Sequence, residues 1–193
     1  MTVFPTAYFG SIGYFRELLK AEDVYIEAKE HFVKQTLRTR CTILGANGKQ
    51  QLSVPVEKPH GSKTPMDQLI ISQTEKWQKD HWKSIESAYA ASPYFEAYDR
   101  EIKGLIYSEE RNLLRFNNEI TQSILSWLHL QKDVRLTTEY SVFENDFRQF
   151  DFEKEPEPKK YIQVFNHAGF SNGLSILDLL FCEGPMARNF ILS

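Results

Sequence analysis

The order of the predicted secondary-structure elements is the feature that most constrains the fold of this 193-residue chain. Short strands and one helix, Ile12 to Ala21, are expected in the first half, and the second half is expected to be largely helical. A late strand over residues 161–165 is expected to return to the N-terminal sheet. This order predicts one α/β domain over residues 1–193, in which mostly N-terminal strands form a mixed sheet and a helical C-terminal half packs on it.

An Asn-Gly pair, which is the strongest short turn signal, predicts a β-hairpin in the first half. It lies in the segment Gly45-Ala46-Asn47-Gly48, between strands expected at residues 37–44 and 51–56. Apolar and polar residues alternate in the second of these strands, as they do in a half-buried strand. Further short strands are expected at Thr2–Phe4, Val24–Ile26 and Leu69–Ile71.

Apolar residues at helical spacing predict the helices of the second half. Ser72 stands three residues before Glu75, a capping-box spacing that predicts the start of a helix there. The face of that helix that is expected to be buried carries Trp77, His81, Ile85 and Tyr89. Ser175 and Asp178 repeat the spacing before a final short helix.

Charge and apolar patterning exclude several classes of protein. The net charge is −3, from 23 Lys and Arg against 26 Asp and Glu, so the basic footprint of a nucleic-acid binder is missing. The two cysteines do not indicate a disulfide scaffold. No stretch reaches the roughly 20 apolar residues that span a bilayer, and the N-terminus lacks the pattern of a signal peptide. We therefore expect a cytoplasmic protein that acts on a small molecule, without nucleic acid or a transmembrane segment.

The segment Pro5–Phe15 is predicted to follow a strand and enter a helix, which makes it a candidate ligand site. In open α/β sheets, ligands collect at the carboxyl ends of strands, where helix N-termini present N–H groups to anions. Gly10 and Gly13 allow close approach of a ligand, and Tyr8 and Tyr14 supply hydroxyls. The alternative is a tight turn with packed aromatic rings, which needs the same glycines.

Four polar residues after the second strand form another candidate group: His31, Lys34, Arg38 and Arg40. Together they are suited to bind a phosphate or carboxylate, with His31 as an acid or base. The alternative is a solvated strand face, because charged side chains are normally exposed.

His81 and Asp178 each have two interpretations. His81 is either a ligand-binding residue or a packed, hydrogen-bonded histidine. Asp178 is either the carboxylate of a capping box or an inward-facing group near Gln163. The five histidines and two cysteines do not show metal-ligand spacing, so no metal is expected. The sequence points to no particular cofactor.

Several short motifs occur in a definite order along most of the chain. They are Pro5-x-x-Tyr8, Gly13-Tyr14-Phe15, Gly48-Lys49-x-x-Leu52-x-Val54-Pro55-Val56, His81-x-Lys83-Ser84 with Tyr89, Pro93-Tyr94-Phe95, and residues 174–180 ending near Gly184-Pro185. At these residues the chain resembles the WbqC-like family of bacterial proteins. The resemblance implies a pathway context, because members often sit among genes for surface polysaccharide and O-antigen synthesis.

The chain departs from the family pattern after the second predicted strand. The family typically carries an acidic pair there, followed by Gln, an aromatic residue and a later Asn-Arg. Glu27, Glu30 and His31 are the closest replacements in this chain, and Thr39-Arg40 stands in place of Asn-Arg. Phe4 replaces the family's opening Gln before Pro5. If the acidic pair acts in catalysis, the activity is altered or lost here.

The resemblance implies a transferase that acts on a sugar or sugar nucleotide in surface polysaccharide (O-antigen type) biosynthesis. In this hypothesis Lys34, Arg38 and Arg40 hold a diphosphate, Tyr8 or Tyr14 orients the sugar, and His31 takes a proton. The alternative is a non-catalytic binding or scaffold protein of a glycan-assembly pathway, which the altered acidic pair favours. Convergence of the tyrosines, His31 and Arg40 in one cleft favours the enzyme, and scattered positions favour the scaffold. The sequence leaves the oligomeric state open.

Overall fold

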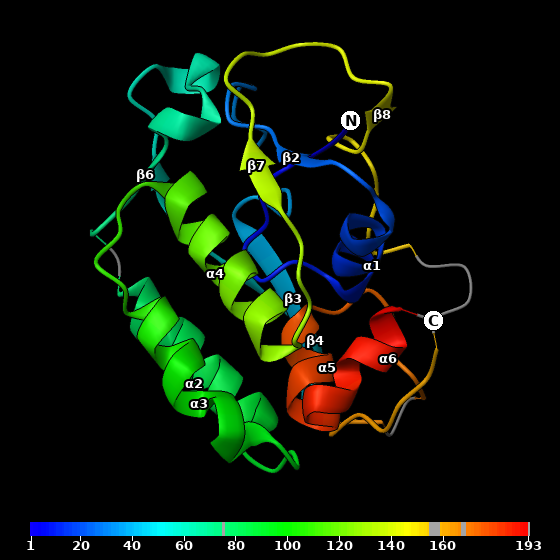
Figure 1. Ribbon diagram of the computed structural model, residues 1–193. Coiled ribbons are helices and arrows are strands. Elements are labelled where there is room, and N and C mark those ends of the chain that lie inside the picture. The colour runs from blue at the N-terminus through cyan, green and yellow to red at the C-terminus, as the bar shows by residue number, and fades with distance from the viewer. Residues whose placement is uncertain (75, 155–158, 167–168, 193) are drawn as a thin grey trace.

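The computed structural model describes residues 1–74, 76–154, 159–166 and 169–192. Its largest sheet, named the central sheet, has four parallel strands (Figure 1). Its strands, in spatial order, are β7 (Val134–Leu136), β2 (Val24–Ile26), β1 (Thr2–Phe4) and β8 (Asn145–Asp146). Every neighbouring pair is parallel. The predicted α/β class is confirmed, and both later strands come from the second half of the chain.

The first crossover, helix α1 (Ile12–Lys20), joins β1 to its neighbour β2. It begins at Ser11, whose hydroxyl oxygen accepts a hydrogen bond from the backbone N–H of Tyr14 at 3.2 Å, as an N-cap residue does. Tyr14, Phe15 and Leu18 turn one face of the helix into the core. The strands β1 and β2 and this helix therefore occupy the predicted places.

The antiparallel strand pairs form two separate ladders beside this sheet. Strand β3 (Arg40–Gly45) pairs with β4 (Gly48–Ser53), and β5 (Val56–Glu57) pairs with β6 (Ile70–Ile71). The hairpin turn is confirmed, and Gly48 supplies the φ of +104° that a residue with a side chain rarely adopts. Because these ladders stand apart, the central sheet is parallel throughout.

The helices pack in two groups, with β3 in contact with α2 of one group and α5 of the other. Figure 1 shows α2, α3 and α4 on one side of the molecule and α1, α5 and α6 on the other. The helix bounds are α2 (Trp77–Tyr89), α3 (Phe95–Ile106), α4 (Leu113–Trp127), α5 (Ile176–Glu183) and α6 (Ala187–Ile191). Single 3-10 turns are η1 (Gly61–Lys63), η2 (Met66–Gln68) and η3 (Gly184–Met186).

Two sequence-based expectations are wrong. Residues 161–165 form no strand, and β7 and β8 complete the sheet instead. The Ser72 hydroxyl accepts a hydrogen bond from Thr74 rather than capping a helix, because α2 begins only at Trp77. Glu75, the other half of that proposed capping box, lies outside the described residues.

Two glycine substitutions, one directly after α5 and one inside α3, test how closely the protein packs around these helices. Gly184 has a φ of +54°, and an added Cβ would lie 2.4 Å from the Tyr94 ring, so Gly184→Ala is expected to destabilise the protein by about 1–3 kcal/mol. Gly104, inside α3, has open space around it, so Gly104→Ala is expected to stabilise it by about 0.5–1 kcal/mol. Urea unfolding of both variants measures these changes. Equal changes in the free energy of unfolding of the two variants would contradict the close contact between Gly184 and Tyr94.

Candidate functional site

A polar pocket of about 350 Å³ lies beside β3, on the side of the hairpin that meets α5. This volume is typical of small-molecule sites, which span about 300–1,000 Å³. Segments far apart in the sequence form its walls, namely Phe9 and Ser11, residues 35–42, Gln51, residues 149–153, and Gly173 with Ser175.

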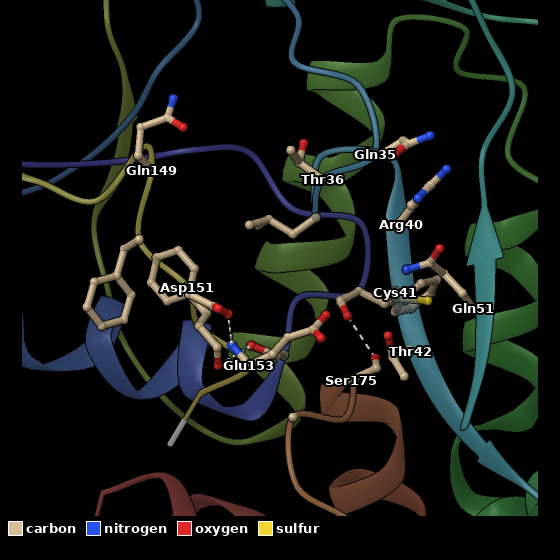
Figure 2. Close-up of a pocket in the computed structure, with 16 residues that line it drawn as sticks. Gln35, Thr36, Arg40, Cys41, Thr42, Gln51, Gln149, Asp151, Glu153 and Ser175 are labelled. Atoms are coloured by element: carbon tan, nitrogen blue, oxygen red, sulfur yellow. Dashed lines mark hydrogen bonds between the residues drawn. The ribbon is translucent and has the colours of Figure 1, made fainter. Parts of the chain in front are cut away.

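The pocket offers many hydrogen-bonding groups and both signs of charge. Figure 2 shows Asp151 and Glu153 on one side and Arg40 on the other. Amide and hydroxyl side chains complete the polar lining, from Gln35, Gln51, Gln149, Ser11, Thr36, Thr42 and Ser175. The hydroxyls of Ser11, Thr36 and Ser175 already bond within the protein. The glutamine amides both donate and accept hydrogen bonds, so they suit a ligand rich in hydroxyls.

The two carboxyl groups of the pocket have pKa values shifted in opposite directions. A hydrogen bond from Lys154, whose Nζ lies 3.0 Å from Oδ2 of Asp151, lowers the pKa of Asp151. Partial burial raises the pKa of Glu153, and Asp151 raises it further, while Lys49 and Thr42 oppose the shift. The Asp151 shift comes from an exposed ion pair, so Glu153 is the one of these two carboxyl groups whose surroundings favour proton uptake.

The backbone around the pocket is tightly constrained. Phe9 and Gln35 have φ values of +40° and +59°, an unusual conformation for residues with side chains that is often found at functional sites. Gly173, with a φ of +65°, leaves room for the Glu153 carbonyl, which would lie 2.7 Å from an added Cβ. Ser175 donates a hydrogen bond to the Phe9 carbonyl at 2.7 Å and so fixes the floor.

Two buried ion pairs connect opposite walls behind the pocket. Arg38 binds Glu30 through two hydrogen bonds of 2.7 and 2.8 Å, and Arg148 binds Glu27 at 2.9 Å. Arg38 also donates to the backbone carbonyl of Arg148 at 3.0 Å, which links the two pairs. Burial raises the pKa of Glu30, and Arg38 opposes that shift. Glu27 and Arg38, both predicted as site residues, therefore hold the walls without lining the pocket.

Tyr8 and His81 form a buried pair in the aromatic core. Oη of Tyr8 lies 2.8 Å from Nδ1 of His81, and both side chains are buried outside the pocket lining. Burial raises the pKa of Tyr8. Burial lowers the pKa of His81 to about 4, and a hydrogen bond with the Ser53 backbone partly opposes this. His81 is thus a packed, hydrogen-bonded residue.

Tyr14 and Gly13 lie inside the first turn of α1. Tyr14 donates its hydroxyl hydrogen bond to the Pro5 carbonyl at 3.0 Å, and Gly13 is buried in the helix. The N–H groups of Ile12 and Tyr14 already bond to Leu174 and Ser11. The start of α1 therefore keeps these two N–H groups for the protein itself.

The predicted cationic group is dispersed. His31 and Lys34 are exposed and lie outside the pocket lining, whereas Arg40 lines it. Tyr8, Tyr14, His31 and Arg40 do not converge on one cleft. Their roles in ligand binding remain predictions, and Arg40 alone of the four has the position that such a role needs.

Asp178 takes the inward-facing role. Its carboxylate accepts hydrogen bonds from the Tyr161 hydroxyl at 2.5 Å and from Nε2 of Gln163 at 3.1 Å. Burial raises the pKa of Asp178, and these bonds oppose the shift. Ser175 caps α5 as predicted, by accepting a hydrogen bond from Leu177, while Asp178 ties the 161–163 segment to that helix.

The pocket wall at residues 149–153 is not predictable from the sequence. Gln149, Asp151 and Glu153 stand in a charged stretch that is typical of a surface loop, and nothing local in it indicates a pocket. Their position depends on Gly173 and on the ion pair of Arg148, which are contacts between distant segments.

Comparison with known families supports the sequence resemblance. The sequence model of the WbqC-like protein family matches residues 6–150. The chain belongs to this family. The match includes the pocket walls at Phe9, Ser11 and residues 35–51, whereas Asp151, Glu153 and the Gly173–Ser175 floor lie beyond the matched residues.

A relative in Mycobacterium tuberculosis shows a similarity over nearly the full chain. The "Uncharacterized protein Rv1507c" is 24% identical over 213 aligned positions, which cover 93% of this chain and 91% of that protein. No solved structure matches the chain significantly. Within the described part of the chain, no helix is long and apolar enough to cross a membrane, and no group of three or more His, Cys, Asp or Glu side chains is placed to hold a metal ion.

The buried His81 predicts a specific pH dependence of stability. Its pKa is about 4 in the folded protein and near 6.5 when unfolded. Between these pH values the unfolded chain binds a proton that the folded protein does not bind. The contribution of neutral His81 to the free energy of unfolding is therefore complete above about pH 6.5 and is lost as the pH falls towards 4. The free energy of unfolding falls by about 3 kcal/mol over this range. Urea unfolding at several pH values measures this effect. The free energy of unfolding is expected to depend less on pH in His81→Gln than in the wild type, and the same pH dependence in both proteins would contradict the lowered pKa of His81.

Proposed function

We propose that the pocket binds a sugar or sugar nucleotide and that the protein is a group transferase of bacterial surface polysaccharide (O-antigen type) biosynthesis. The observation that supports this proposal is the placement of Asp151 and Glu153 opposite Arg40 across a pocket with many amide and hydroxyl side chains. The pathway context rests on family membership.

Recognition of the substrate is divided between the polar lining and Arg40. The amide side chains of Gln35, Gln51 and Gln149 match the hydroxyl groups of a sugar. No carboxylate among the described residues forms an ion pair with Arg40. Its guanidinium is therefore available for a phosphate, which it binds well through two parallel hydrogen bonds.

Glu153 is the proposed general base. Its raised pKa makes its carboxylate a better proton acceptor than an ordinary glutamate. The proton of a sugar hydroxyl passes to Glu153, and the hydroxyl oxygen bonds to the transferred group of an activated donor. The bond between that group and its leaving group breaks, and the electron pair departs with the leaving group. Asp151 stays ionised beside Lys154.

A non-catalytic binding protein of a glycan-assembly pathway is the second candidate. The dispersed positions of Tyr8, Tyr14 and His31 favour it, because an active site was expected to bring these groups together. In this candidate the pocket retains its ligand, and Glu153 serves only to bind it.

Replacement of Glu153 separates the two candidates. A thermal-shift screen of sugars, sugar phosphates and sugar nucleotides first identifies a ligand, and transfer is then assayed with acyl and aminoacyl donors. Glu153→Gln is expected to bind within a few-fold of wild type and to lower the transfer rate about 10²- to 10⁴-fold. The wild-type rate is expected to rise with pH as Glu153 loses its proton.

The control for this experiment is Glu139→Gln, which changes an exposed glutamate outside the pocket. Unchanged transfer by Glu153→Gln would contradict the base assignment. Wild-type binding without transfer from any donor would favour the binding protein.

A further inference from the structure

Phe150 is an aromatic side chain at the pocket that the proposed chemistry does not use. It lines the pocket, and yet 48% of its surface is exposed. An aromatic ring that is half exposed in the wall of a pocket is in position to contact a bound ligand. Of the other strongly exposed aromatic residues, Tyr107 and Tyr140 lie outside the pocket lining, and Tyr140 packs over the Arg148 guanidinium at 4.5 Å.

The ring is held rigidly by two neighbours. Phe147 and Phe152 meet it at angles of 61°, with ring centroids 5.1 and 4.9 Å away. These rings belong to a larger stack on Phe4 of the central sheet. These contacts hold the ring in place, and about half of its surface stays exposed to another flat group.

The backbone beneath Phe150 is also fixed. Its N–H donates to the Phe147 carbonyl at 3.1 Å, which closes a turn. Arg148, two residues earlier, is bound by Glu27 and Arg38, and Phe152, two residues later, is 3% exposed. Phe150 is therefore presented on an anchored turn, so it loses little conformational freedom when a ligand binds.

We propose that Phe150 is the stacking platform for the nucleobase of a nucleotide-linked substrate. This inference rests on the proposed function and selects a sugar nucleotide over a free sugar. The base lies on Phe150 at the edge of the pocket. The diphosphate reaches Arg40 and the sugar lies against Glu153.

Binding measurements on Phe150 variants test this proposal. The probes are nucleoside diphosphates (UDP, ADP, GDP, CDP and dTDP) and sugar 1-phosphates, with dissociation constants from calorimetry. Stacking of one base on an aromatic ring contributes about 1–3 kcal/mol, so Phe150→Ala is expected to weaken nucleoside diphosphate binding about 5- to 150-fold. Phe150→Trp is expected to retain binding within a few-fold, and sugar 1-phosphate affinity is expected to stay unchanged in both variants.

The matched control is Tyr107→Ala, which removes an exposed aromatic ring outside the pocket lining, and near-ultraviolet circular dichroism checks that each variant is folded. An equal loss of sugar 1-phosphate affinity in Phe150→Ala would overturn the proposal, because the ring would then support the sugar. If the wild type binds sugar 1-phosphates and does not bind nucleoside diphosphates, the stacking proposal is also overturned, but the proposed function still stands. Failure of both probes to bind would remove the proposed function as well.

Discussion

The hydrogen bond from Arg38 to the backbone carbonyl of Arg148 is the contact on which the pocket depends. It joins two ion pairs that are almost fully buried, Arg38 with Glu30 and Arg148 with Glu27. Burying four charged groups is costly unless each has partners, and here each has one or more. Thr137 supplies a further hydrogen bond to Glu27 at 2.7 Å. The network therefore fixes two segments that are more than 100 residues apart in sequence.

This network lies where the parallel strands end. Glu27 directly follows β2, Thr137 directly follows β7, and Arg148 lies two residues beyond β8. Carboxyl ends of parallel strands are the usual place for ligands in open α/β sheets. In this protein the position is filled by paired charges, and the open pocket lies beside it, against β3 and the start of α5. The central sheet thus supports the pocket walls rather than lining the pocket itself.

The parts of the fold that were predictable are those with strong local patterns. The Asn47-Gly48 turn, the amphipathic helices and the strands β1 and β2 were visible because adjacent residues determine them. Strands β7 and β8 are three and two residues long, and they were not visible because, unlike β1 and β2, they are mostly exposed and lack an apolar pattern. The same limit applies to the site. Segment Pro5–Phe15 does reach the pocket, but through Phe9 and Ser11, since the tyrosine hydroxyls are satisfied inside the protein.

Hydrogen–deuterium exchange of Arg38→Lys tests the central claim that one network holds both walls. Lysine keeps the positive charge near Glu30 but lacks the planar guanidinium that bonds Glu30 and the Arg148 carbonyl together. We expect faster exchange both at Thr39 and at Phe150, whose backbone N–H groups bond to the Thr36 and Phe147 carbonyls. Exchange in α3 and α4 is expected to stay unchanged, and Arg135→Lys, at an exposed ion pair, is the control. Faster exchange at Thr39 alone would contradict the proposal that one network holds both walls.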